Sequence, residues 1–327
     1  MIIIEADKEE YARHRASGLC FSSVFFNDIN SKKTDEVKYL LFKDNKYRFA
    51  LPLGIQEKKA RCPFSAPFGF LEPIKSTTSV ECYDDAIKSL DLFLIDLGIV
   101  SMEFTLPPSF YDDGINLMAN SLFRNSYTIK KIDLNYSYDL EKFNAESFNN
   151  LLPRNGRKNL NIALNSCLTL QTIKHSELSP ETIASAYSII AMNRESKGYP
   201  LRMTLQDLQN TSRGITCDVF IVLFNEIAIA SAVVYHTTDV VAQVIYWGDA
   251  NSYSSLKPIN FLSYNLVNHY KRLGFKYLDI GPSSENSIPN YGLCDFKTSI
   301  GCSTSLKICM TKSYPVNKED FFYHEKY

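Results

Sequence analysis

The chain has 327 residues, and its 35 basic and 36 acidic side chains leave a net charge of −1 at pH 7. This balance argues against nonspecific binding to DNA, which requires a basic surface. No apolar run approaches the roughly 18 residues that a membrane span requires. The length predicts two domains, which we place at residues 1–140 and 141–327.

The cysteines and the first residues favour a reduced, cytoplasmic protein. The sequence begins MIIIEADKEEYARH, in which acidic residues follow a short apolar run, unlike a signal peptide. The eight cysteines include no Cys-x-x-Cys pair, and none stands with histidines at zinc-finger spacing. We therefore expect free thiols, no metal site and a cytoplasmic location.

The first half predicts a hairpin, a helix and two further strands. Residues 37–56 form the hairpin, which turns at Asp44-Asn45. An irregular loop, CPFSAPFGFLEP, leads from it towards a helix over residues 84–98. That helix has one apolar face of four residues, Ile87, Leu90, Leu94 and Leu97. Strands follow at residues 99–105 and 126–140.

The second half predicts a similar series of elements. The stretch from Asn144 to Ile173 reads as a helix interrupted near Pro153 and followed by a strand, and two helices come next, at residues 181–198 and 204–214. They precede a hairpin turning near Asn225-Glu226, a strand at residues 240–250, a helix at 259–274 and a strand at 275–284. The apolar face of this last helix consists of Ile259, Leu262, Leu266, Tyr270 and Leu273.

The two halves share one unit, in which a helix ends in Leu-Gly and leads into a strand and a Pro/Ser loop. The glycines are Gly98 and Gly274, and glycine commonly ends a helix because it tolerates positive φ. The repeat predicts an α/β (α+β) protein of two similar domains. We expect each domain to have a mixed, mostly antiparallel sheet flanked by helices. The tail after about residue 305 begins as a strand, and we expect it to pack back on the first domain.

Two segments carry a resemblance to a known family. The first is the basic cluster from Arg154 to Lys158. The second runs from Tyr246 to Gly301 and ends in a Gly-Leu-x-x-Phe-Lys-x-x-x-Gly motif, formed by Gly292, Leu293, Phe296, Lys297 and Gly301. The chain resembles the Fem-type (FemAB-like) aminoacyltransferases of the GNAT acyltransferase superfamily. The resemblance implies a duplicated GNAT fold and transfer of an acyl or aminoacyl group to an amine or hydroxyl.

The loop before the predicted helix at residues 259–274 does not decide which acyl donor the protein uses. GNAT enzymes that use acetyl-CoA usually carry glycines there, so that backbone N–H groups cradle the pyrophosphate. The loop here is ANSYSSLKP, without glycine, and its possible phosphate donors are side chains of Ser252, Ser254, Ser255 and Lys257. Our first hypothesis is an acyl-CoA donor and direct transfer to a small-molecule acceptor. The alternatives are an aminoacyl-tRNA donor with a cell-wall or glycan precursor as acceptor, and a non-catalytic binding module on the same fold.

The catalytic candidates are Lys297, Asp249 and Tyr291. By resemblance, the Lys297 cation lies beside the reacting carbonyl and stabilises the oxyanion; the alternative is a surface lysine that snorkels to water beside an apolar strand. Asp249, or Asp279, would accept a proton from the incoming amine, although a carboxylate that caps a loop is the commoner reading. Tyr291 would donate to the substrate, or else is a packed aromatic.

The binding candidates lie in three further places. Arg154, Arg157 and Lys158 share one helix face and would hold a phosphate, unless the face is merely solvated. Tyr246 and Trp247 end a strand, where substrate-binding residues are common. In the first half, Phe68 lies in a loop that resembles one near the Fem-type acceptor cleft; the alternative is an aromatic plug in an inter-domain core.

Overall fold

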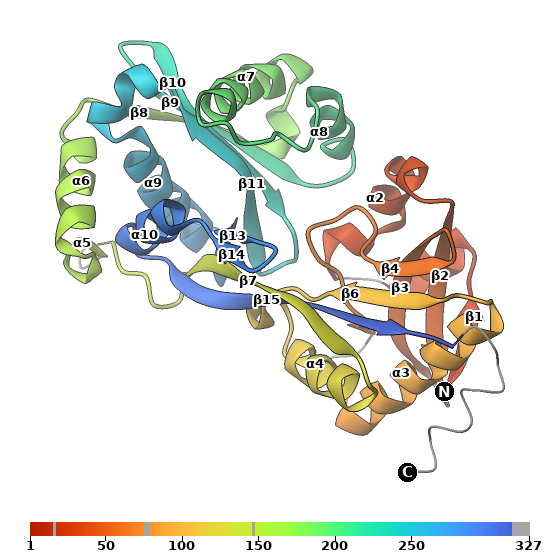
Figure 1. Ribbon diagram of the computed structural model, residues 1–327. Helices are drawn as coiled ribbons and strands as arrows, with labels where there is room; N and C mark the ends of the chain where they lie inside the picture. Colours follow the sequence, from red (N-terminus) through yellow and green to blue (C-terminus); the bar gives the residue numbers. More distant parts are fainter. Residues whose placement is uncertain (16–17, 75–78, 146–147, 316–327) are drawn as a thin grey trace. The chain divides into compact units, whose positions relative to one another are not determined.

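The computed structural model describes residues 1–15, 18–74, 79–145 and 148–315 (Figure 1). These residues belong to two compact units. The described residues of unit 1 lie within Met1–Asp133 and Leu306–Pro315, and those of unit 2 within Leu134–Ser305. The limits 1–140 and 141–327 stay a prediction about independently folding domains.

Unit 1 is built on a mixed sheet in the order β1-β2-β3-β4-β6-β15, with β5 on β3. Its strands are β1 Ile2–Glu5, β2 Glu36–Lys43, β3 Tyr47–Gln56, β4 Lys59–Cys62, β5 Glu72–Pro73, β6 Ser101–Thr105 and β15 Ser303–Ser313. Its helices are α1 Lys8–His14, α2 Val24–Ile29, α3 Val80–Asp96 and α4 Gly114–Arg124, with short 3-10 turns at η1 Cys20–Ser22, η2 Ser31–Lys33 and η3 Ser109–Tyr111. The C-terminal strand β15 pairs antiparallel with β6, so the tail does return to the first unit.

The strands of unit 2 follow the order β8-β9-β10-β11-β12-β7 and are again mixed in direction. Its strands are β7 Thr128–Asp139, β8 Thr169–Ile173, β9 Cys217–Phe224, β10 Ile227–His236, β11 Val241–Asp249 and β12 Tyr277–Pro282, with a small hairpin of β13 Ser284–Glu285 and β14 Ile288–Pro289. Its helices are α5 Phe148–Leu151, α6 Arg154–Leu164, α7 Pro180–Ser196, α8 Leu205–Thr211, α9 Pro258–Arg272 and α10 Tyr291–Ser299, with 3-10 turns at η4 His175–Glu177 and η5 Asn251–Leu256.

The two units repeat the same series of strand pairings. From β1 in unit 1, the series is antiparallel, antiparallel, antiparallel, parallel and antiparallel. From β8 in unit 2 the series is identical, and the single parallel pair, β4–β6 or β11–β12, falls at the same place. Each parallel pair is connected by one long helix, α3 or α9, as a parallel crossover requires. The predicted fold class and the predicted duplication are both confirmed.

The two long crossover helices also end in the same way. Gly98 and Gly274 have φ of +69° and +83°, and each donates its N–H to the carbonyl three residues earlier. The residues before them, Leu97 and Leu273, are the C-caps. We predicted both leucines on the buried faces of their helices, but they are 44% and 51% exposed. Each leucine is the C-cap at which its helix ends, so its side chain does not continue the buried face of the helix.

Helices cover both faces of the sheet in unit 2. On β10, Ser231 donates to the Ala186 carbonyl of α7 at 2.7 Å. Its neighbours Ala230 and Ala232 belong to the opposite core, which contains Leu262 of α9. Side chains alternate between the faces of a strand, so α7 and α9 pack on opposite faces (Figure 1).

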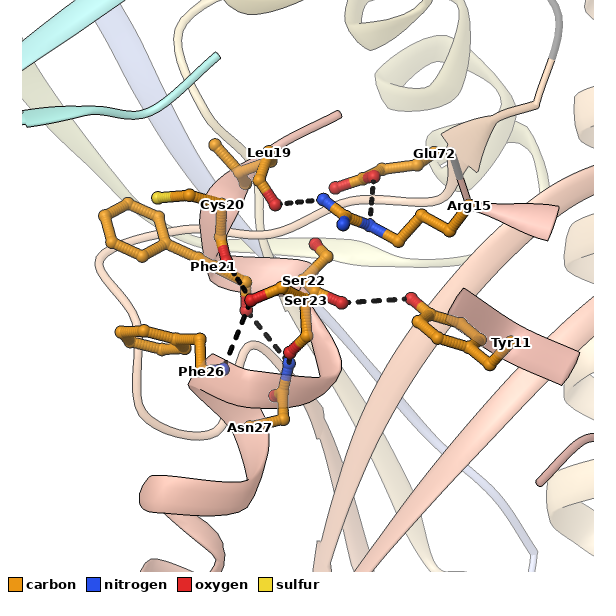
Figure 2. A network of polar contacts seen from close by, with 10 residues as sticks. All are labelled: Tyr11, Arg15, Leu19, Cys20, Phe21, Ser22, Ser23, Phe26, Asn27 and Glu72. Atoms are coloured by element: carbon orange, nitrogen blue, oxygen red, sulfur yellow. Dashed lines mark hydrogen bonds and ion pairs between the residues drawn. The ribbon is translucent and has the colours of Figure 1, made fainter. Parts of the chain in front are cut away.

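In unit 1, a buried ion pair joins Arg15, at the end of α1, to Glu72 of β5 (Figure 2). Arg15 Nε lies 2.9 Å from Glu72 Oε2, and the two side chains are only 10% and 5% exposed. Arg15 also donates to the Leu19 carbonyl, and Tyr11 donates to the Ser22 carbonyl at 3.3 Å. Because removing one partner of such a pair leaves the other charge buried alone, the pair holds the end of α1 against β5.

Candidate functional site

The parallel strands β11 and β12 pair over only three residues and then separate. Their pairing ends at Gln243 opposite Asp279. Beyond this point, β11 continues beside β10 as far as Asp249, and β12 continues beside β7 as far as Pro282. We call the carboxyl ends of these two strands the fork. In sheets with parallel strands, ligands bind where neighbouring strands diverge at their carboxyl ends.

A buried carboxylate marks the point where the strands part. Asp279 is fully buried and accepts hydrogen bonds from Asn135 at 2.7 Å and Gln243 at 2.9 Å, which come from β7 and β11. It also accepts from the backbone N–H of Gly281 at 2.8 Å, across a bulge in β12. Asp279 thus ties three neighbouring strands together and holds the bulge in shape. These bonds favour a positioning role over that of a proton acceptor.

The bulge brings three consecutive carbonyl groups onto one ammonium. Lys297, on α10, donates to the carbonyls of Ile280 at 3.0 Å, Gly281 at 2.8 Å and Pro282 at 3.0 Å. Gly281 has φ of +78°, a left-handed conformation that an L side chain rarely adopts. This glycine therefore turns the strand so that its carbonyls converge. We call the three oxygens the carbonyl collar.

The environment of Lys297 depresses its basicity. The side chain is 2% exposed, and its Nζ lies 5.5 Å from the centre of the Tyr136 ring. Burial lowers the pKa of Lys297 to about 8, although the nearby thiol of Cys302 and the carboxylate of Asp279 act in the opposite direction. Lys297 is therefore still mainly a cation at neutral pH, and it loses its proton when the pH rises moderately above neutral.

The alternative of a snorkelling surface lysine is wrong, because Lys297 is buried on a helix and not beside an apolar strand at the surface. Its three ammonium hydrogens match the three oxygens of the collar, so in this state none points to a substrate. A direct bond to an oxyanion requires Lys297 to release one carbonyl. Its role in transfer stays a prediction.

The end of β11 supplies side chains to both faces of the fork. Trp247 packs edge-to-face on Phe296, with ring centres 6.5 Å apart, on the α9 side of the sheet. Tyr246 lies on the opposite, α7 side, and its hydroxyl accepts from the Met203 N–H at 3.2 Å. Both rings are half-buried. Their substrate-binding role stays a prediction, now with a position at the fork.

The other two catalytic candidates, Asp249 and Tyr291, have very different surroundings. Asp249 is buried and accepts from Asn193 Nδ2 at 2.8 Å, with Lys197 at 3.7 Å. These contacts tie the end of β11 to α7, and they do not test the alternative of a carboxylate that caps a loop. Tyr291 is 76% exposed at the start of α10, so the alternative of a packed aromatic is wrong for it. The contacts of Asp249 and Tyr291 do not test whether either residue takes part in catalysis.

Phe68 belongs to the interior of unit 1. Its side chain is 1% exposed, and its ring centre lies 4.6 Å from that of Tyr111 and 5.7 Å from that of Phe21. A ring enclosed in this way has no surface to offer a substrate. The substrate-binding interpretation therefore fails for this state of the protein, and Phe68 is instead a core side chain.

The predicted basic cluster does share one face of a helix. Arg154, Arg157 and Lys158 are exposed on α6, where they line an open surface depression together with Asn161, Ile162 and Asn165. Arg157 donates to the Leu152 carbonyl at 3.3 Å. The exposure is what both a phosphate site and a solvated face require, so phosphate binding stays a prediction.

The loop before α9 uses much of its backbone internally. It forms the 3-10 turn η5, in which the N–H of Tyr253 donates to Ala250 and that of Lys257 donates to Ser254. Pro258, at the first position of α9, has no N–H. These groups cannot cradle a pyrophosphate as a glycine loop does. The remaining predicted phosphate donors are the exposed Ser252, Ser254 and Ser255 and the partly exposed Lys257.

Sequence reasoning missed the polar partners that build the fork. Asn135 and Gln243 lie 144 and 36 residues from Asp279 in the chain. Polar residues inside otherwise apolar strands are the signal that could have identified them, because a buried polar group needs a partner. In the part of the chain that the structure describes, no group of three His, Cys, Asp or Glu side chains is placed to hold a metal ion.

Comparison with solved structures identifies the fold. No protein-family model matches the chain, and no curated protein matches its sequence. The crystal structure of FemX matches with a TM-score of 0.71 at 12% identity, over 100% of both chains. The C-terminal domain of a putative lysylphosphatidylglycerol synthetase from Agrobacterium fabrum gives 0.61 at 11% identity, covering 98% of this chain and 96% of that one. L-PGS from Bacillus licheniformis gives 0.58 at 11% identity with the same coverage.

These likenesses establish that the chain has the fold of FemX. The described residues of the chain form two compact units. The structural resemblance predicted from the Phe-Lys segment is therefore confirmed. Of the helices that the structure describes, none is both long and apolar enough to cross a membrane.

Proposed function

We propose that this protein is an aminoacyltransferase that moves an aminoacyl group from aminoacyl-tRNA to an amine on a cell-wall or glycan precursor. The observation that carries the proposal is the buried Lys297 in its carbonyl collar at the fork, on the fold of FemX. A buried lysine with a depressed pKa, at the diverging ends of parallel strands, is the kind of perturbed group that marks reaction sites.

In the proposed reaction, the acceptor amine attacks the ester carbonyl of the donor. A C–N bond forms and the C–O bond to the terminal ribose breaks; the amine loses a proton, and the ribose oxygen gains one. Lys297 supplies positive charge near the carbonyl oxygen as it becomes an oxyanion. The collar keeps this charge in place before the substrate arrives, so little reorganisation is needed in the transition state.

The choice of donor rests on the loop at η5. The amides of Tyr253 and Lys257 are engaged within the turn, and Pro258 has no N–H, so the loop offers fewer backbone donors to the pyrophosphate of CoA than a glycine loop does. An aminoacyl-tRNA donor does not need a pyrophosphate cradle. The proposal thus reverses the order of the two donors expected from the sequence.

Acyl-CoA remains the second candidate because of one observation. Ser252, Ser254 and Ser255 are all exposed on η5, close in sequence to Lys257. Side-chain hydroxyls and an ammonium can bind phosphate without help from the backbone. On this reading, the same fork would accept a simple acyl group.

A donor-consumption assay tests the proposal. The purified protein would be incubated with tRNA carrying a radiolabelled amino acid, and in parallel with radiolabelled acetyl-CoA, each with a pool of amine-bearing cell-wall precursors. We expect label to leave the tRNA and appear in a precursor, and Lys297→Met to abolish this transfer. Consumption of acetyl-CoA alone would favour the second candidate. Binding of a donor without consumption by the wild type would favour a non-catalytic module.

A further inference from the structure

Arg194 lies near the end of α7, beside Tyr246 on the α7 side of the fork. The neighbouring Asn193 donates from Nδ2 to both the carbonyl and the Oδ1 of Asp249, each at 2.8 Å. Gly248 allows this close approach, because a Cβ there would lie 2.9 Å from Asn193 Cβ and 3.2 Å from Ile190 Cα. The end of α7 is therefore fixed against the end of β11.

The guanidinium of Arg194 has no counter-ion among the residues that the structure describes. Its side chain forms no ion pair and no hydrogen bond with them, and its Nε is buried without any partner. Its one close aromatic contact is the ring of Tyr246, whose centre lies 5.9 Å from Cζ. Burial lowers the pKa of Arg194 below its ordinary value, although an arginine remains charged at neutral pH.

The nearest carboxylates at the fork are already engaged. Asp249 accepts from Asn193 and lies near Lys197, and Asp279 is held by Asn135 and Gln243. Arg194 also lies within electrostatic reach of the second cation, because its charge is among the causes, after burial, that lower the pKa of Lys297. The charge of Lys297 is therefore not a counter-ion for Arg194 but a second positive charge near it.

We propose that Arg194 binds an oxyanion group of the substrate, a carboxylate or a phosphate, on the α7 side of the fork. A half-buried guanidinium without a counter-ion is costly, and a ligand anion offsets that cost. The planar fork of N–H groups matches both anions in a bidentate manner. This inference rests on the proposed function in taking the fork as the reaction site, and it adds that the bound substrate carries a negative group there.

Calorimetric titration with small anions tests the inference without any transfer reaction. The probes are inorganic pyrophosphate and N-acetylglycine, titrated separately at low salt into the full chain. The variants are Arg194→Gln, Arg194→Lys and the control Arg213→Gln, which removes an exposed arginine outside the fork. We expect the wild type to bind at least one probe, and Arg194→Gln to weaken that binding about tenfold to a hundredfold, the equivalent of one charge-assisted hydrogen bond.

The two probes separate the sources of the anion. Binding of pyrophosphate alone assigns Arg194 to a phosphate group, and binding of N-acetylglycine alone assigns it to a carboxylate. The affinity of Arg194→Lys for the anion should lie between that of the wild type and that of Arg194→Gln, because an ammonium keeps the charge but lacks the planar geometry. Arg213→Gln should bind like the wild type.

Thermal unfolding without ligand distinguishes a binding residue from a structural one. If Arg194 stabilised the fold, its replacement would lower the melting temperature. Removal of an unpaired, half-buried charge should instead leave the melting temperature unchanged or raise it. A wild type that binds neither anion, or an Arg194→Gln variant with unaltered affinity, overturns the inference. Either result is independent of the donor-consumption assay, so the two proposals fail separately.

Discussion

The ammonium of Lys297 lies 2.8 Å from the carbonyl oxygen of Gly281, the middle oxygen of the carbonyl collar. This contact joins helix α10 to the bulge in β12, and the bulge exists because the Gly281 N–H turns back to Asp279 Oδ1. One backbone position thus presents its N–H to a buried carboxylate and its carbonyl to a buried cation. The collar is consequently sensitive to the conformation of a single glycine.

Replacement of Gly281 by alanine should therefore damage the site through the backbone. A Cβ at this position would meet no atom within 4 Å, so the effect comes from φ of +78° and not from a clash. We expect a loss of about 1–2 kcal/mol in the free energy of unfolding, the cost of a left-handed L-residue. Turnover should fall about tenfold or more, since small displacements of catalytic groups are costly.

Gly98→Ala is the matched control for this substitution. Gly98 has φ of +69° and open space around its Cα, but it follows α3 in unit 1. Its loss of stability, measured by urea unfolding, should resemble that of Gly281→Ala. Equal transfer rates in the two variants would show that the collar does not depend on Gly281.

The repeated design of the fold could be read from the sequence, because its signals are local. Turn residues at Asn225-Glu226 and a stop glycine after each long helix act within a few residues, and all of them lie where we expected. Lys297 was singled out only through a family resemblance. Nothing in its flanking residues indicates that three carbonyls surround it.

The rest of the site depends on contacts between distant segments. The collar requires the bulge in β12, which forms against β7, far away in the chain. Arg194 has no counter-ion in the described part of the chain, a property that no sequence pattern displays. Phe68 illustrates the converse, because an aromatic ring in a Pro-rich loop can face either the interior or the solvent, and the packing of Tyr111 and Phe21 decides the outcome.

The exposed basic cluster on α6 makes a prediction about binding. Arg154→Ala combined with Arg157→Ala should weaken binding of the tRNA donor, and the loss should shrink as salt rises, since exposed charge contacts are screened. The melting temperature should barely change, because both side chains are exposed. Filter binding at two salt concentrations would measure this. Donor binding equal to that of Arg213→Ala would identify the cluster as a solvated face.

A second buried carboxylate, Asp218, should govern stability in acid. It accepts from Tyr270 at 3.0 Å and from the His175 N–H at 3.1 Å, and it pairs with His236 Nε2 at 2.8 Å. Burial alone would raise the pKa of Asp218, but the hydrogen bond and charge of His236 outweigh it and lower the pKa below its ordinary value.

The direction of the pH effect follows from this lowered pKa. As pH falls below about 4, the unfolded chain binds a proton at this carboxyl before the folded chain does, so the free energy of unfolding decreases. Asp218→Asn should be less stable than the wild type at neutral pH by about 1–3 kcal/mol, and the difference should shrink in acid. Chemical unfolding at several pH values measures this, and a difference that stays constant down to acid pH would contradict the account.

The pH dependence of turnover should reveal which form of Lys297 is active. If its cation stabilises the oxyanion, the rate falls as pH rises through the pKa of about 8, because the charge is lost. A neutral amine acting as a base would give a rate that rises through the same pH. A profile of the second kind, absent in Lys297→Met, would assign proton transfer to this residue in place of charge stabilisation.

Substitution of Lys297 should separate its chemical role from its structural one. Lys297→Met keeps the length of the side chain and removes the charge, and we expect turnover to fall by about a hundredfold to a thousandfold, the loss of one oxyanion donor. Substrate affinity should change much less, because the interaction strengthens only in the transition state. Lys297→Arg should restore little activity, since a planar guanidinium cannot fit three carbonyls that converge on one point. Single-turnover transfer and unfolding are to be measured on the same samples. A methionine variant that is folded, binds donor and transfers at the wild-type rate would leave Lys297 as a structural pin of the bulge.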